Sequence, residues 1–158
     1  MSYDSYKVPA DWKWIAQIKR EIGVPVIGNG DVDSGKKAVE MLDICDGAMI
    51  ARAAIGDPQI FERIHYYIKT GKEQERDLKK NIKCFADYLE LAEKRDVVDI
   101  GRIKLIGSHF LRGFAGAAQK RAAFMQVKTT DEAREFVKEL VVDKTFKYAY
   151  THGCVHDS

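Results

Sequence analysis

Two short segments place small residues, an amide, carboxylates and a guanidinium where they could bind a phosphate group. Residues 28–31 read Gly-Asn-Gly-Asp after the apolar run 24–27, and Arg52 lies between two alanines after the run 48–50. Backbone N–H groups of a small-residue turn, an amide and a guanidinium fork suit a phosphate monoester. The pattern therefore predicts a phosphate site that contains Asn29, Gly30, Asp31 and Arg52. A tight turn in an ordinary α/β protein would explain the glycines equally well.

Two well-known phosphate motifs fit this stretch less well. The dinucleotide fingerprint requires a third glycine, and the chain has Asp33 there. The P-loop motif matches at Gly30, Gly35 and Lys36, but Lys37 stands where a magnesium-binding hydroxyl is needed. The remaining template is the phosphate site of a (β/α)8 barrel, which is built from the loops after strands seven and eight.

The elements that must position these residues follow from hydrophobic spacing. Strands are predicted at 24–28 and 47–51, with a helix over 34–44 between them, so that the segment forms a β-α-β unit. A helix is predicted over 11–23, and another begins at Asp57-Pro58 and ends at Gly71. The predicted buried side of that last helix is Ile60, Phe61, Ile64, Tyr67 and Ile68.

From residue 72 onward the pattern is helical only. A long helix is predicted over 72–96, followed by helices at 100–112, 117–127 and 129–142, the last with a capping box of Thr129 and Glu132. We therefore predict α/β plus all-α architecture: domain 1–71, the last βα units of a TIM (β/α)8 barrel, domain 72–143, a helical bundle, and a flexible tail at 144–158. Two parallel strands cannot close a barrel of ~250 residues, so the barrel is expected to be incomplete in this chain.

Composition indicates a globular protein of a reducing compartment. The chain has 158 residues, of which 46% are hydrophobic and 32% charged, and its net charge is +2. The three cysteines are odd in number and far apart, which favours a cytoplasmic protein without disulfides, and Cys45 and Cys84 are interpreted as structural. No apolar stretch approaches the ~18 residues of a membrane span, and the polar N-terminus predicts no signal peptide.

Positive charge is concentrated in residues 101–128, which contain no aspartate or glutamate. Lys104, Ser108 and Arg112 are predicted to share one helical face. Such a segment suits a nucleic-acid backbone, although a solvated helix face explains it as well. Phe110 and Phe114 are interpreted as core residues rather than base-stacking platforms. The basic residues are Arg102, Lys104, Arg112, Lys120, Arg121 and Lys128.

The remaining candidate ligands and bases are interpreted as non-functional. His152, Cys154 and His156 alternate near the C-terminus, but their spacing matches no standard zinc site, so no metal is predicted. His65 and His109 are interpreted as helix-surface or packing residues rather than catalysts.

Three stretches of the chain together resemble one family. VPVIGNGDV at 24–32, DGAMIARAAIGDPQIF at 46–61 and ADWKWIAQIK at 10–19 are similar to the C-terminal signature of the tRNA-dihydrouridine synthases. The order of basic and small residues at 102–121 also resembles the helical domain of that family. The similarity extends over roughly residues 8–140 in a consistent order.

The resemblance implies a flavoprotein that reduces uridine in tRNA, with FMN in a (β/α)8 barrel, NADPH as reductant and a helical domain that binds tRNA. It assigns Asn29, Gly30, Asp31, Ala51 and Arg52 to the FMN loops. It assigns Arg102, Lys104, Arg112, Lys120 and Arg121 to tRNA contacts.

The chain also departs from the family pattern. The family usually has Gly-Arg-Gly where this chain has Ala51-Arg52-Ala53, and Gln59 replaces a usual aromatic residue. The catalytic cysteine of the family, in an Asn-x-Gly-Cys-Pro context, belongs to the first half of the barrel and is not in this sequence. No catalytic residue is therefore predicted here, and the chain alone is expected to be inactive without a partner that supplies that half. A non-catalytic RNA-binding module and another phosphate-binding half-barrel remain as alternatives.

Overall fold

The computed structural model of the protein describes residues 9–95 and 99–142. The chain divides into two compact units, an α/β unit that ends at Arg76 and a helical unit that begins at Asp77. Each unit has its own cluster of buried apolar side chains.

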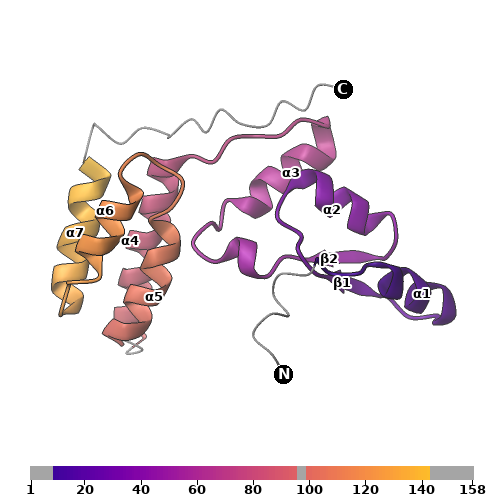
Figure 1. Ribbon diagram of the computed structural model, residues 1–158, viewed down its shortest axis with the longest axis horizontal. Helices are drawn as coiled ribbons and strands as arrows, with labels where there is room; N and C mark the ends of the chain where they lie inside the picture. Colours follow the sequence, from indigo (N-terminus) through magenta and orange to yellow (C-terminus); the bar gives the residue numbers. More distant parts are fainter. Residues whose placement is uncertain (1–8, 96–98, 143–158) are drawn as a thin grey trace. The chain divides into compact units, whose positions relative to one another are not determined.

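The α/β unit is a β-α-β arrangement with further helices (Figure 1). The two strands are parallel, with Ile27 opposite Gly47 and Asn29 opposite Met49. Its elements are α1 (Lys13–Glu21), β1 (Ile27–Asn29), α2 (Gly35–Leu42), β2 (Gly47–Met49), the 3-10 helix η2 (Arg52–Ala54) and α3 (Ile60–Thr70).

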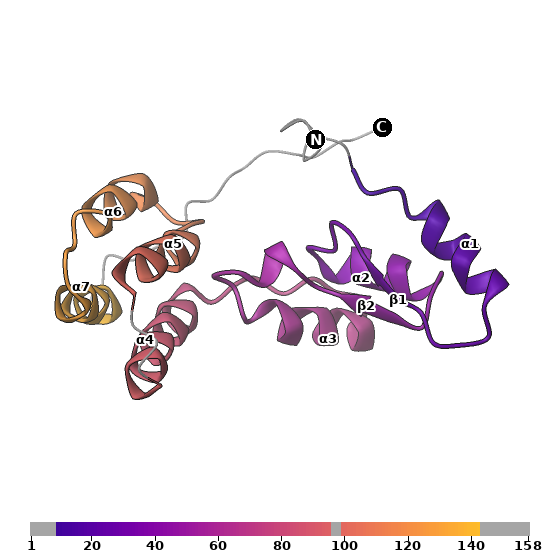
Figure 2. The ribbon, with the colours of Figure 1, turned by 90° about the horizontal axis from the view of Figure 1, so that it is seen from below.

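The two faces of this small sheet differ in what covers them. Figures 1 and 2 show α2 and α3 along one face of the strands. Gly28 lies so close to α2 that a Cβ there would overlap Met41 Sδ, so the glycine permits close helix–strand packing. On the opposite face, Ile27 and Met49 are 70% and 53% exposed. An apolar sheet face that stays largely exposed is unusual, because burial of such side chains is what normally stabilises a sheet.

An ion pair attaches α1 to the sheet. The Lys19 ammonium lies 2.7 Å from the Asp46 carboxylate, which also accepts a hydrogen bond from the Val26 N–H. The hydrogen bond from Lys19, followed by that from Val26, lowers the pKa of Asp46.

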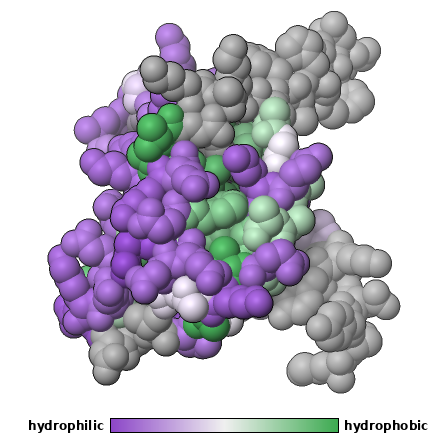
Figure 3. All heavy atoms as spheres, turned by 90° about the vertical axis from the view of Figure 1, so that its left-hand side faces the viewer, coloured by the Kyte–Doolittle hydropathy of each residue, from purple (hydrophilic) through white to green (hydrophobic). Residues whose placement is uncertain are grey.

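The helical unit consists of α4 (Leu78–Lys94), α5 (Ile100–Phe110), α6 (Ala117–Phe124) and α7 (Thr130–Val142). Its core centres on the stacked rings of Phe85 and Phe110, with Phe124 edge-on to Phe85. Gly107 permits this packing, since a Cβ there would overlap both Phe85 and Phe124. Figure 3 shows one side of the molecule, where hydrophilic residues surround a group of hydrophobic ones.

Side-chain hydrogen bonds cap the starts of α4, α5 and α7. The carboxylate of Asp77 accepts a hydrogen bond from Lys80 N, and that of Asp99 accepts from Gly101 N and Arg102 N. The Thr129 hydroxyl accepts from Glu132 N as predicted, but the Glu132 carboxylate accepts from Lys128 N, one residue earlier than in a capping box.

Several predictions of local structure were wrong. The long helix begins at Leu78 rather than 72, because Asp77 caps it. Helix α5 ends at Phe110, so Arg112 does not share a helical face with Lys104. Strand β1 begins at Ile27 rather than at residue 24.

Burial was also misjudged at two positions of α3. Phe61 and Ile68 are 53% and 49% exposed, whereas Ile60 and Ile64 are buried as predicted. Phe110 and Phe114 are core residues, and Cys45 is buried, as predicted. The described helices include none that is both long and apolar enough to span a membrane. The cluster of His152, Cys154 and His156 lies outside the described residues.

Candidate functional site

The predicted phosphate residues lie around one hollow at the C-terminal ends of the two strands. Its volume is about 560 Å³. All five residues predicted for the cofactor loops line it, and Val32, Asp33 and Ala53 line it as well. The five are Asn29, Gly30, Asp31, Ala51 and Arg52. The parallel register explains this arrangement, because Asn29 ends β1 directly beside Met49 at the end of β2.

The turn after β1 has an unusual backbone. Gly30 has φ of 138°, and Asp31 has φ of 52°, in the left-handed region where aspartate is one of the few tolerated non-glycine residues. A Cβ at Gly30 would also approach Ala10 closely. The turn is therefore specified by residue type at both positions, and it keeps backbone at Gly30 close to the hollow.

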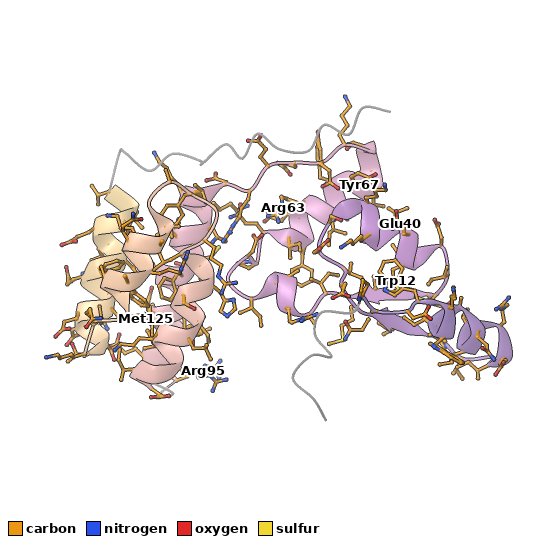
Figure 4. All side chains as sticks on the ribbon, in the orientation of Figure 1. Trp12, Glu40, Arg63, Tyr67, Arg95 and Met125 are labelled. Atoms are coloured by element: carbon orange, nitrogen blue, oxygen red, sulfur yellow. The ribbon has the colours of Figure 1, made fainter. Side chains whose placement is uncertain are left out.

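The segment before α1 fixes this turn from outside. The indole Nε1 of Trp12 donates to the Gly30 carbonyl at 2.9 Å, and Ala10 N donates to Asp31 Oδ2 at 2.9 Å. Figure 4 labels Trp12 in the α/β unit. Neither Ala10 nor Trp12 was predicted as a site residue, although both belong to the stretch 10–19 that resembles the family.

The charges at the hollow are arranged as two ion pairs. Arg52 Nη2 lies 2.8 Å from Asp31 Oδ1, and Lys37 Nζ lies 2.8 Å from Asp33 Oδ2. Both carboxylates that line the hollow therefore have a cationic partner. Because a guanidinium has five N–H donors, Arg52 can hold Asp31 and still donate to a ligand anion.

The loop after η2 is fixed to the last residue of the α/β unit. Asp57 accepts two hydrogen bonds from Arg63, at 3.0 and 2.7 Å, and lies 3.5 Å from Arg76 Nε. Arg76 also donates to the Gly56 carbonyl at 2.6 Å. These side chains are largely buried, so the network holds the chain that follows Arg52 in one position.

The predicted RNA contacts all belong to the helical unit, but they differ in environment. Arg102 and Arg112 are exposed, whereas Lys104, Lys120 and Arg121 are half-buried. Arg121 Nη1 donates to the Leu111 carbonyl at 2.8 Å and so connects α6 to the end of α5. Arg121 therefore has a structural contact in addition to any role in binding.

Neither histidine in the described part of the chain lines the hollow. His109 lies on α5, where burial and then the nearby charge of Arg112 lower its pKa. The thiol of Cys45 faces the carbonyls of Met41 and Gly47, each at 3.2 Å, in the buried cluster of the α/β unit.

Comparison with known proteins identifies relatives of this chain. Residues 2–147 match the family described as Dihydrouridine synthase (Dus). A probable tRNA-dihydrouridine synthase 1 of Synechocystis is 26% identical over 140 residues, which cover 86% of this chain and 39% of the relative. The tRNA-dihydrouridine synthase B of Pseudomonas syringae is 32% identical over 149 residues, which cover 86% and 42%. A probable tRNA-dihydrouridine synthase of Rickettsia bellii is 41% identical over 71 residues, which cover 44% and 22%. The chain thus spans about two fifths of the length of the first two relatives.

Proposed function

Because this chain belongs to the dihydrouridine synthase family, we propose that it forms the C-terminal part of a flavin-dependent enzyme that reduces uridine to dihydrouridine in tRNA. The observation that carries the proposal is the convergence of Asn29, Gly30 and Arg52 on one hollow. The first unit then contributes the phosphate end of an FMN site, and the second contributes to tRNA binding.

The residues of the hollow suit the phosphate of FMN. The Arg52 guanidinium supplies charge-assisted donors, and the Asn29 amide and the Gly30 backbone supply further hydrogen bonds. Asp31 is itself an anion, so its role is to orient Arg52 rather than to contact the phosphate. Ala51 and Ala53 line the same hollow. Their methyl groups leave a phosphate less room to approach the backbone than glycines would.

The α/β unit has the features expected of the last βα units of a (β/α)8 barrel. Ile27 and Met49 expose apolar side chains on the face that would be the barrel interior. The described sheet has two strands, so both of its outer edges lack a neighbouring strand in that part of the chain. A preceding half-barrel with NADPH-dependent chemistry and the catalytic cysteine would cover this face and complete the site.

When bound in the complete enzyme, FMN would supply a hydride to the C5=C6 bond of uridine, and the catalytic cysteine of the preceding half-barrel would supply the proton. This chain holds the phosphate group through Arg52 and the turn at Gly30, which fixes the position of the cofactor. The helical unit presents Arg102, Lys104, Arg112 and Lys120 to the tRNA backbone.

The test is a chimaera that joins this chain to the preceding part of the Pseudomonas syringae relative. The chimaera is expected to bind FMN and to form dihydrouridine in unmodified tRNA when NADPH is supplied, as measured by mass spectrometry of digested tRNA. The 158-residue chain alone is expected to form none. If the chimaera folds and binds tRNA but binds no FMN, the flavin assignment is wrong and a non-catalytic RNA-binding module becomes the better interpretation.

A further inference from the structure

A hollow between α4 and α5 is separate from the phosphate site and combines an aromatic ring, an apolar floor and two arginines. Its volume is about 260 Å³. Helix α4 and its C-cap contribute Tyr88, Leu91, Ala92 and Arg95, and helix α5 contributes Arg102 and Ile106. Ligand pockets for larger molecules begin at roughly 300 Å³, so this one suits a group no larger than a single nucleotide.

The apolar part of this hollow is accessible rather than fully packed. Leu91 is 55% exposed, while Tyr88 and Ile106 are half-buried against the core of the helical unit. The Tyr88 ring is stacked on Phe85 at a centroid distance of 6.3 Å, which fixes its plane. A fixed aromatic ring beside exposed apolar groups is a suitable surface for an unstacked base.

The position of Arg102 is unfavourable for the helix that carries it. Arg102 lies in the first turn of α5, which has no acidic residue, and a cation at a helix N-terminus opposes the helix dipole. Arg95 is the C-cap of α4, where a cation is favourable, so it needs no ligand to explain it. An anion bound between the two guanidinium groups would offset the cost at Arg102.

The acidic side chains of the surrounding helices have other partners. Glu90 pairs with Lys94 at 2.7 Å, Glu93 pairs with Arg134 at 2.6 Å, and Asp99 caps α5. Glu90 and Asp87 line a different hollow, beside Arg134 and Lys138. Within residues 9–95 and 99–142, neither Arg95 nor Arg102 forms an ion pair with a carboxylate. The described side chains that line this hollow therefore carry a net positive charge, which complements a phosphodiester.

We propose that this hollow binds one unstacked nucleotide of RNA, with the base against Tyr88 and Leu91 and the flanking phosphate between Arg95 and Arg102. Figure 4 labels Arg95 in the helical unit. The proposal rests on the proposed function in one respect, namely that the helical unit binds RNA. The proposal adds that this hollow binds a base of a single-stranded RNA segment in addition to the phosphate backbone.

The test measures binding of the full 158-residue chain to fluorescein-labelled oligouridylate, to an RNA duplex of the same length and to unmodified tRNA, by fluorescence anisotropy across a salt series. Tyr88→Leu is expected to weaken binding to oligouridylate by about tenfold, because the base no longer stacks on an aromatic ring. Its effect on the duplex is expected to be small, since duplex bases stay stacked. The salt slope is expected to remain that of the wild type.

The arginines are tested by the double variant Arg95→Gln/Arg102→Gln, which is expected to lower the salt slope on oligouridylate by ~0.7 for each phosphate that is no longer neutralised. The matched control is Lys79→Gln, which removes one charge from α4 at a position ~2.5 turns before Tyr88 and so on the opposite face. The control is expected to bind like the wild type. Circular dichroism and urea unfolding establish that each variant is folded.

Leu91→Asp is a second variant that leaves the hydrophobic core intact, because the Leu91 side chain is 55% exposed. It places a carboxylate at the hollow and is expected to weaken oligouridylate binding at least as much as Tyr88→Leu. If the folded Leu91→Asp and Tyr88→Leu variants bind oligouridylate with wild-type affinity, the proposed nucleotide site is wrong. That result would leave the proposal that the helical unit binds tRNA intact. If the wild-type chain binds none of the three RNAs at low salt, both this site and the RNA-binding role proposed for the unit are wrong.

Discussion

Arg52 Nη2 lies 2.8 Å from Asp31 Oδ1, so the guanidinium predicted to hold a phosphate is itself held by a carboxylate from the neighbouring strand end. The other oxygen of Asp31 accepts a hydrogen bond from Ala10 N. Asp31 thus connects three segments that are far apart in sequence. We propose that its role is to set the position of Arg52, which would explain why a carboxylate belongs to the proposed phosphate site.

Replacing Asp31 by asparagine tests this role. Asparagine tolerates the left-handed backbone at this position and can still accept from Ala10 N, so the change removes mainly the charge that orients Arg52. We expect a decrease of roughly 0.2–1 kcal/mol in the free energy of unfolding, as for an exposed ion pair, and weaker FMN binding by the chimaera. Asp33→Asn, which breaks the similar pair with Lys37, serves as control and is expected to change FMN affinity less. Equal FMN affinity of wild type and Asp31→Asn would refute the orienting role.

Gly107→Ala should destabilise the helical unit. A methyl group at this position would overlap the rings of Phe85 and Phe124, and such overpacking costs about 1–3 kcal/mol. The control is Gly101→Ala in the same helix, whose Cβ would lie at an ordinary distance of 3.5 Å from the Asp99 carboxylate. This control should stabilise the chain slightly, because alanine has less freedom than glycine in the unfolded state. Urea unfolding measures both, and a neutral result for Gly107→Ala would contradict the packing described for this core.

Stability should depend on pH through His109. Burial, and then the charge of Arg112, lower the pKa of His109 in the folded state below its ordinary value of 6.5. Between the folded and the unfolded pKa the unfolded chain binds more protons, so the free energy of unfolding falls as pH drops through 6.5 and below. His109→Gln should flatten this part of the profile, whereas His65→Gln, at an exposed site of the α/β unit, should not. Parallel profiles for wild type and His109→Gln would rule out this source of pH dependence.

Lys104→Ala/Arg112→Ala should lower the salt dependence of tRNA binding. The slope of log affinity against log salt is expected to decrease by about 1 for each side chain that no longer neutralises a phosphate. The two residues do not share a helical face, since α5 ends at Phe110, but both belong to the segment without acidic residues. Arg20→Ala on α1 removes one exposed positive charge outside the helical unit, like that of Arg112, and serves as the control. An unchanged slope in the double variant would exclude these residues from the tRNA-binding surface.

The sequence alone predicted those helices and strands that are specified by residues close to one another in the chain. Ser34 and Gly71 mark the start of α2 and the end of α3, and the β-α-β order follows from two apolar runs around one helical repeat. The convergence of Asn29 and Arg52 follows from that topology, because parallel strands end at the same edge.

What the sequence did not reveal depends on tertiary structure. The hydrogen bond from the Trp12 indole to Gly30 joins segments separated by α1 and β1, and no local pattern predicts such an interaction. The hydrophobic spacing of α3 predicted that Phe61 and Ile68 are buried, because spacing alone does not show how far neighbouring elements cover a helix face. In the structure they are 53% and 49% exposed. The start of α4 was misplaced because residues 72–76 are polar helix formers, and only the cap at Asp77 decides where the helix begins.

The most direct measurement is the affinity of the chimaera for FMN compared with riboflavin, which lacks the phosphate, in wild-type and Arg52→Ala forms. If Arg52 holds the phosphate, the wild type binds FMN much more tightly than riboflavin. Arg52→Ala then weakens FMN binding by about tenfold or more, as expected when a charge-assisted hydrogen bond is removed, with little effect on riboflavin. Equal affinity of the wild type for the two flavins, or an equal decrease for both in Arg52→Ala, would contradict a phosphate site at this hollow.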